Sequence, residues 1–175
     1  DLKNSDAAGQ LGDANCVVEF FSFGCPWCYR LEPAVTKWVG QQGTQIHFKK
    51  IPVIFHKDWE YYARAYYTAE ALSLNAKLNP ALFKAILDDK QSLNSKESMT
   101  AFLTKNGVDL ATAQSAFSNS PSIDLDIATS QRMMASYHIA AVPAFVVSNR
   151  YKTDLQMAKT EKRLFEKIGR ASCRE

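Results

Sequence analysis

The sequence lacks the features that mark membrane-spanning, fibrous and disordered chains. No apolar run approaches the roughly 18 residues that a bilayer span requires. Only 7 Gly and 6 Pro occur among 175 residues, while 46% of the residues are hydrophobic, which excludes collagen-like and low-complexity compositions. We therefore expect a globular chain that buries a core of one domain or slightly more.

The sequence also has little net charge. Its 21 basic and 18 acidic residues give a formal charge of +3. The densest basic spots, Lys49-Lys50 and Lys162-Arg163, are only pairs, whereas nucleic-acid surfaces carry clustered Lys and Arg. Charge alone therefore indicates no partner and gives no reason to expect nucleic-acid binding.

Both ends of the chain have an unusual sequence. The chain opens at Asp1, with neither an initiator Met nor the profile of a signal peptide, as expected of a processed form or a fragment. Residues 168–175 (IGRASCRE) can be back-translated into a common sequencing-adapter sequence. We expect 168–175 to be a non-native tail; the alternative is an ordinary basic tail that ends a helix.

The CPWC motif at 25–28 lies where a predicted strand meets a predicted helix. Residues 17–23 (VVEFFSF) are β-branched and aromatic, and apolar side chains recur at helical spacing over 29–40. Pro26 suits the first turn of a helix, because its missing N–H would have no intrahelical partner there. The sulfur of Cys25 would then lie beside the positive end of the helix dipole, which stabilises a thiolate.

This spacing predicts a redox-active pair of thiols. Cys25 and Cys28 share a helical face and can form a disulfide without large movement of the backbone. Cys25 would be the exposed attacking thiol and Cys28 the shielded resolving thiol. A zinc site is one alternative, but the three histidines and Cys16 show no paired ligand spacing. An inert structural disulfide is another, although so small a ring constrains little of the chain.

Glu19 interrupts the apolar strand with a carboxyl group. In a strand buried on both faces a carboxylate is costly unless it is paired or protonated. A Glu of raised pKa beneath the sulfur of Cys28 could accept and return the proton that this thiol exchanges in each turnover. The alternative is an edge strand on which Glu19 faces water. The first interpretation makes Cys25, Cys28 and Glu19 the catalytic residues and requires no metal.

The rest of the chain predicts further strands around a long helical region. Apolar and aromatic residues repeat at intervals of three and four through that region. Asn94 and Glu97 form a capping-box pattern for one of its helices. The predicted elements are a strand at 46–55, helices between 57 and 121, a longer helix near 123–138, a strand after Val142-Pro143, a hairpin turn at 148–150 and a terminal helix near 158–167.

This order of elements resembles the DsbA family of thiol:disulfide oxidoreductases. The resemblance covers about residues 16–167 and is carried by Glu19–Tyr29 (EFFSFGCPWCY) and Val142–Phe145 (VPAF). It implies an α/β, thioredoxin-like fold with an all-helical domain inserted between its βαβ and ββα halves. The domains would be a discontinuous thioredoxin-like domain at 1–56 and 122–167 and an inserted helical domain at 57–121.

The resemblance also implies roles for the site residues. Cys25 would form the mixed disulfide, Cys28 would resolve it, and Glu19 would match the family's buried acidic residue. Pro143 would be cis, and the main chain at Val142 would pair with an extended segment of the substrate. The substrate-binding residues would be Pro26, Trp27, Val142 and Pro143.

The chain matches the family pattern weakly at one further charged pair and departs from it at two other sites. Glu32 and Lys50 match a charged pair that the family often has near the site, but we interpret them as two solvated surface charges. Trp27 stands where the relatives closest to the best-known oxidases carry His, so we expect a less acidic Cys25 and a less oxidising disulfide. In the hairpin, Asn149-Arg150 replaces the usual Asn-Gly and leaves the turn type open.

The function implied is the donation of disulfides to reduced, unfolded or exported proteins in the periplasm. A DsbB-type membrane quinone reductase would reoxidise the protein, which would act as a monomer and need no cofactor. One alternative is a reductase or isomerase of the same superfamily, which the reduction potential would distinguish. The other is a non-catalytic holdase for unfolded chains, whose effect on clients would survive Cys25→Ser.

Overall fold

A computed structural model describes residues 16–172 of the chain. These residues divide into two compact units. The first contains the strand that ends at Phe21, the segment Trp27–Ile51 and the chain from Arg132 onward, and the second contains Ser22–Pro26 and Pro52–Gln131. The predicted helical insertion, 57–121, lies wholly within the second unit.

The first unit is built on a sheet in which β1 lies in the interior. The described strands, in spatial order, are β2 (His47–Pro52), β1 (Cys16–Phe21), β3 (Ala144–Val147) and β4 (Tyr151–Asp154). β1 and β3 are antiparallel, with Glu19 opposite Phe145, and β3 and β4 are also antiparallel. All six residues of β1 are buried. Because β1 has a neighbour on each side, the edge-strand alternative for Glu19 is wrong.

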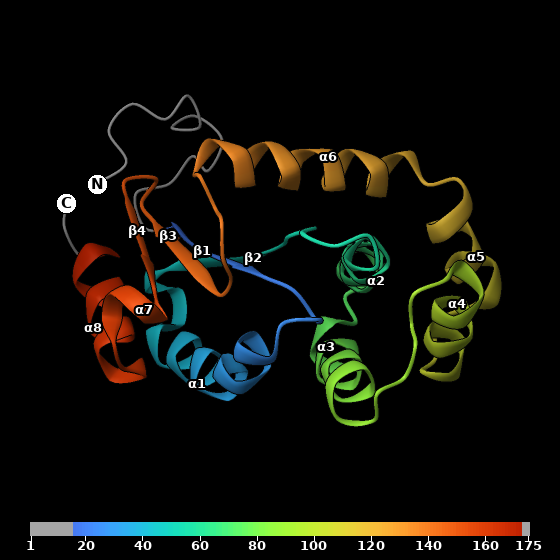
Figure 1. The fold of residues 1–175 in the computed structure, drawn as a ribbon, viewed down its shortest axis with the longest axis horizontal. Helices are drawn as coiled ribbons and strands as arrows, with labels where there is room; N and C mark the ends of the chain where they lie inside the picture. Colours follow the sequence, from blue (N-terminus) through green and yellow to red (C-terminus); the bar gives the residue numbers. More distant parts are fainter. Residues whose placement is uncertain (1–15, 173–175) are drawn as a thin grey trace. The chain divides into compact units, whose positions relative to one another are not determined.

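Helices α1 (Pro26–Gln42) and α8 (Glu161–Ser172) pack on one face of this sheet (Figure 1). Val17 and Phe145 from the sheet share a buried cluster with Leu31 of α1 and Leu164 of α8. Side chains alternate between the two faces of a strand. Glu19 is two residues from Val17 and opposite Phe145, so its side chain also faces α1.

The β3–β4 hairpin turns through two residues in the left-handed region. Ser148 and Asn149 have φ values of 51° and 56°, and the N–H of Arg150 donates to the carbonyl of Val147 at 3.0 Å. Two positive φ values inside an i to i+3 hydrogen bond are typical of a type I′ turn. Asn149 tolerates this conformation better than most residues, and the glycine expected in an Asn-Gly turn is not needed.

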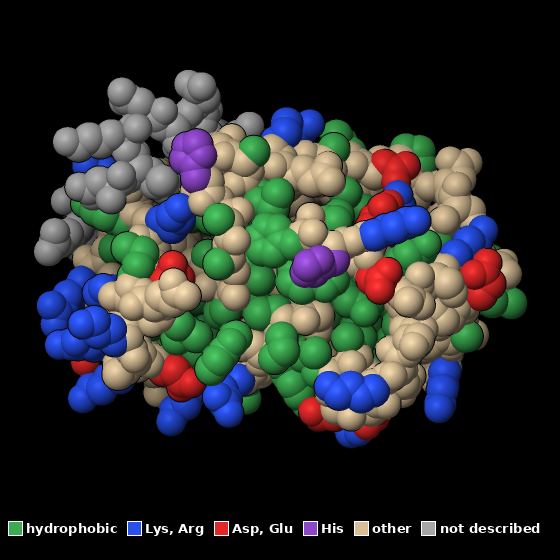
Figure 2. Space-filling model, in the orientation of Figure 1, with side chains coloured by type: hydrophobic (Ala, Val, Ile, Leu, Met, Phe, Trp, Pro, Cys, Tyr) green, Lys and Arg blue, Asp and Glu red, His purple; other side chains and the backbone are tan. Residues whose placement is uncertain are grey.

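The chain after β4 forms two helices, α7 (Leu155–Ala158) and α8. Figure 2 shows Lys and Arg side chains gathered over α8, which also carries Glu161 and Glu166. α8 continues to Ser172, and Ile168 is fully buried in the cluster beneath it. The structure therefore includes residues 168–172 in the helix, and their non-native origin stays a prediction from the sequence.

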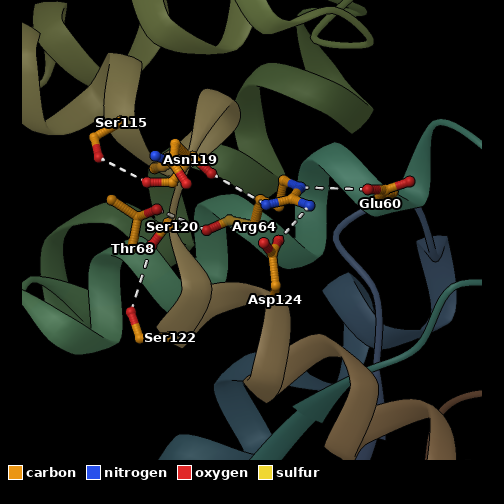
Figure 3. A network of polar contacts seen from close by, with 9 residues as sticks. Glu60, Arg64, Thr68, Ser115, Asn119, Ser120, Ser122 and Asp124 are labelled. Carbon is orange, nitrogen blue, oxygen red and sulfur yellow. Dashed lines mark hydrogen bonds and ion pairs between the residues drawn. The ribbon is translucent and has the colours of Figure 1, made fainter.

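The second unit is helical, and Arg64 joins three of its helices (Figure 3). The guanidinium of Arg64 donates to Asp124 Oδ1 at 2.7 Å, to the carbonyl of Ala116 at 3.2 Å and to Glu60 Oε1 at 3.3 Å. The described helices are α2 (Trp59–Ala71), α3 (Asn75–Phe83), a π-helical turn (Lys84–Asp88), α4 (Lys96–Lys105), α5 (Leu110–Ser118) and α6 (Pro121–Ser136), whose last residues lie in the first unit.

The capping box of α4 lies one residue later than the sequence predicts. The hydroxyl of Ser95 accepts from the N–H of Ser98 at 3.1 Å, and the hydroxyl of Ser98 accepts from the N–H of Ser95 at 3.2 Å. The prediction of Asn94 and Glu97 is therefore wrong. A Ser can replace the usual Glu at the third helical position because its hydroxyl reaches the same N–H.

Candidate active site

The two cysteines of the CPWC motif lie at the start of α1, as the sequence predicts. Pro26 is the first residue of α1, Cys25 directly precedes it, and Cys28 lies in its first turn. The N–H of Cys25 donates to the carbonyl of Ser22 at 3.1 Å, which closes the turn between β1 and α1. The first turn of α1 contains no acidic residue. The positive end of the helix dipole is therefore available to stabilise a thiolate at Cys25.

Both cysteines are more enclosed than the sequence indicates. Cys25 is 5% exposed and Cys28 is 0% exposed. Cys25 is the more solvent-accessible of the two, as the sequence predicts. The description of Cys25 as an exposed thiol is wrong. Only a small edge of this residue meets solvent, so a substrate must bring its sulfur close to the surface to react.

Gly24, immediately before Cys25, is held against the indole of Trp59. A Cβ atom at residue 24 would lie 2.4 Å from Trp59 Nε1, far inside contact distance. Trp59 in turn packs on the rings of Phe55 and His56, with centroid separations of 5.7 and 5.0 Å. Glycine is therefore required at position 24 by this close approach, and the Trp59 ring restrains the segment that leads into Cys25.

The Val142–Pro143 peptide bond is cis, and both residues line a pocket that also includes Trp27. The pocket has a volume of about 300 Å³. Trp27 is 57% exposed, and the guanidinium of Arg30 lies 5.2 Å from the centre of its ring. Three of the four predicted substrate-binding residues thus come together, whereas Pro26 does not line the pocket. The remaining lining residues, which are not among the predicted site residues, are Ala141, Asp154, Leu155 and Gln156.

A buried lysine joins two carboxyl groups beside α1. Lys50, on β2, donates to Glu32 Oε2 on α1, and its Nζ lies 3.4 Å from Glu19 Oε2 on β1. Lys50 is 8% exposed and Glu19 is 0% exposed. The interpretation of Glu32 and Lys50 as solvated surface charges is therefore wrong. The alternating sequence of β2 places Lys50 inward, where burial requires a charged partner.

Glu19 is poised to exchange a proton near neutral pH. Burial raises the pKa of its carboxyl from 4.5 to about 7; the cation of Lys50 lowers that pKa and the charge of Glu32 raises it. Burial disfavours the Lys50 cation, but attraction to Glu19 and Glu32 outweighs this effect and raises the pKa of Lys50. Lys50 therefore stays charged, while Glu19 gains and loses its proton in the range where proton-transfer groups work well.

Residues 16–172 contain neither a metal-binding cluster nor a membrane-spanning helix. This part of the chain contains no cluster of three His, Cys, Asp or Glu side chains able to hold a metal ion. Its helices also include none that is long and apolar enough to cross a membrane.

Arg30, the neighbour of Trp27, could have been found from the sequence, whereas three residues of the pocket lining could not. Residues 27 and 30 are three apart on one helix and are neighbours by helical geometry. Asp154 reaches the pocket only because the β3–β4 hairpin returns it beside Ala144. No local pattern around Asp154, Leu155 and Gln156 indicates that position.

A family model, the relatives described below and solved structures all indicate the same family. The model of the DSBA-like thioredoxin domain matches residues 16–166. The thiol:disulfide interchange protein DsbA of Burkholderia cepacia is 38% identical over 137 residues, which cover 78% of this chain and 64% of that protein. The DsbA of Azotobacter vinelandii is 32% identical over 142 residues, covering 81% of this chain and 66% of that protein. The chain thus spans slightly less than two thirds of these relatives.

Solved structures agree with this assignment. The crystal structure of Pseudomonas aeruginosa DsbA matches with a TM-score of 0.82 and 27% identity, covering 93% of this chain and 89% of that one. The disulfide oxidoreductase DsbA from Proteus mirabilis matches with a TM-score of 0.76 and 26% identity, covering 91% and 85%. These matches confirm the thioredoxin-like fold with a helical insertion that the sequence predicts.

Proposed function

This chain belongs to the DSBA-like thioredoxin domain family, and from that premise we propose that it is a thiol:disulfide oxidoreductase that donates a disulfide to other proteins. The observation that carries the proposal is the position of Cys25 directly before α1, with Cys28 in its first turn. A helix start stabilises the Cys25 thiolate, which makes Cys25 a good leaving group and its disulfide a strong oxidant.

The reaction is an exchange of sulfur–sulfur bonds. A thiolate of the substrate attacks Sγ of Cys25, a new bond forms between them, and the Cys25–Cys28 bond breaks with its electron pair on Cys28. A second thiolate of the substrate then attacks the substrate sulfur of this mixed disulfide and releases Cys25 as a thiolate. The substrate loses two electrons and two protons, and the enzyme is left as a dithiol.

Glu19 is proposed to handle the proton of Cys28. Its side chain faces the helix that carries Cys28, and its pKa of about 7 lets it give a proton to the departing thiolate and take it back on reoxidation. Lys50 and Glu32 act as positioning residues, since their charges adjust the pKa of Glu19 that burial raises.

Substrate binding is proposed at the pocket beside the cis peptide bond. The main chain at Val142 would pair with an extended segment of the substrate, which gives affinity with little dependence on sequence. Trp27 and Pro143 would contact neighbouring side chains of the substrate, and Pro26 would lie at the edge of this surface. An unfolded chain offers the extended segment that such pairing needs.

The cellular role is proposed from the relatives. They carry the name thiol:disulfide interchange protein DsbA, which supports an exchange of thiols and disulfides with other proteins. We propose that this protein carries out that exchange in the periplasm, as a monomer, on reduced, exported proteins. A DsbB-type membrane quinone reductase would restore the disulfide. An oxidase of this kind requires an oxidant outside itself, because each turnover leaves its own pair reduced.

Trapping the mixed disulfide tests the proposal directly. The Cys28→Ser variant lacks the thiol that would displace a bound substrate from Cys25. We expect its Cys25 thiolate to attack a peptide whose cysteine is in a disulfide with glutathione, forming a Cys25–peptide disulfide that is visible by mass spectrometry and releasing glutathione as a thiolate. Cys25→Ser should form none and should not speed the oxidative refolding of a reduced protein. Cys16→Ser serves as the control: it should keep the refolding activity, and it should still form the adduct when it is combined with Cys28→Ser. Normal refolding activity in Cys25→Ser would overturn the proposal and favour a holdase.

A further inference from the structure

The pocket beside the cis peptide bond combines an aromatic ring, aliphatic side chains and one carboxylate. Trp27, Val142, Pro143 and Leu155 supply most of its lining, and Asp154 supplies the only acidic side chain among the described lining residues. Asp154 is half-buried, and its Oδ1 accepts the N–H of Met157 at 2.7 Å, which caps α7. The cap fixes the carboxylate in place, and the second oxygen has no part in this hydrogen bond.

Such a lining suits a long side chain with a cationic tip. Lys and Arg have apolar stems that pack on aliphatic surface and charged ends that seek a carboxylate or the face of an aromatic ring. A volume of about 300 Å³ has room for one such side chain. An acidic tip would meet the carboxylate of Asp154, and a short side chain would leave the pocket unfilled.

We propose that this pocket selects substrates with Arg or Lys next to the reactive cysteine, with Asp154 as the residue that determines the preference. The inference rests on the proposed function, because it concerns the side chain that accompanies the attacking thiol. The cation would lie near Asp154 with its stem against Leu155, Val142 and the ring of Trp27.

Arg30 acts against this preference but does not cancel it. Its guanidinium lies over the Trp27 ring at 5.2 Å from the centre, and Arg30 does not line the pocket. Because Asp154 belongs to the lining and Arg30 does not, we expect a cation in the pocket to lie closer to Asp154 than to Arg30. Because Coulomb energy falls with distance, the attraction is the larger of the two effects. Removing the Arg30 charge should strengthen the preference.

The test uses reduced peptides that contain two cysteines and differ only in the residue beside one of them. Arg, Lys, Ala, Leu and Glu are placed there in turn, on either side of the cysteine, and the rate constant for oxidation by the oxidised protein is measured by acid quench and mass spectrometry. A neighbouring cation also makes a thiol more reactive. The informative quantity is therefore the Arg-to-Ala rate ratio compared between protein variants.

Asp154→Asn removes the charge and keeps a residue that caps a helix well. We expect it to lower the Arg-to-Ala ratio by about three- to tenfold, while Glu166→Gln, an equal change of charge on α8, leaves the ratio as in the wild type. The difference between the variants should shrink at high salt. Arg30→Gln should raise the ratio.

Two results separate this inference from the function on which it rests. The inference would be overturned if the wild type and Asp154→Asn oxidised all the peptides with the same Arg-to-Ala rate ratio. It would also be overturned if the wild type oxidised the Leu peptide faster than the Arg peptide. Either result would leave the proposed function intact. Failure to oxidise any of the peptides would overturn both.

Discussion

Replacing Glu19 by Gln should change how the free energy of unfolding depends on pH. The size of the change follows from the burial of the Glu19 carboxyl group. Burial raises its pKa from 4.5 to about 7, so the folded protein binds this proton more tightly than the unfolded chain. The stabilisation is complete below pH 4.5 and is lost as the pH rises through about 7. Since a tenfold change in an ionisation constant is worth about 1.4 kcal/mol, the loss amounts to roughly 3 kcal/mol.

The assay is urea denaturation of both proteins, fully reduced, from about pH 4 to about pH 9. Gln has nearly the same shape as Glu but no proton to lose, and Lys50 keeps Glu32 as a partner in the variant. Any loss of unfolding free energy that does not depend on protonation is the same at every pH, so it cancels when the difference between the two proteins is compared across the pH range. We expect Glu19→Gln to gain about 3 kcal/mol relative to the wild type across this range. Parallel stability curves would refute the reasoning.

Three other substitutions test separate parts of the site. Lys50→Met removes the cation between two carboxyl groups, so urea denaturation at alkaline pH should show a loss of about 3 to 5 kcal/mol that shrinks in acid; a loss independent of pH would contradict this. Gly24→Ala places a methyl group 2.4 Å from Trp59 Nε1 and should cost about 1 to 3 kcal/mol, and most of that cost should disappear in a Trp59→Ala background. Trp27→His supplies an imidazolium that stabilises the Cys25 thiolate, so the Cys25–Cys28 couple of the variant should be more oxidising than that of the wild type in equilibrium with glutathione. A wild-type couple more oxidising than that of the variant would disprove this expectation.

The features predicted correctly from the sequence depend on short stretches of chain. Pro26 begins α1 because a proline at the first helical position sacrifices no hydrogen bond. The buried strand is visible in the unbroken apolar run of β1, and Glu19 stands out because that run contains no other charge. Local chemistry thus locates both cysteines and the acid.

The features missed depend on residues that are distant in the sequence. Lys50 is 18 residues from Glu32, and their spacing alone gives no sign that β2 turns the lysine inward between two carboxyl groups. Asp154 joins the pocket of Trp27 only after the hairpin has formed. The burial of Cys25 is likewise a result of tertiary packing. The position of Cys25 before a helix predicts its electrostatic surroundings but not its exposure to solvent.

The reduction potential of the Cys25–Cys28 pair is the most direct test of the central claim, that the start of α1 stabilises the Cys25 thiolate and makes the pair an oxidant. It is measured by equilibrating the protein with glutathione mixtures and counting alkylated thiols by mass spectrometry. We predict a potential less negative than about −200 mV, above the range of the reducing cytosolic pool. A value near the roughly −270 mV of thioredoxin would contradict the account.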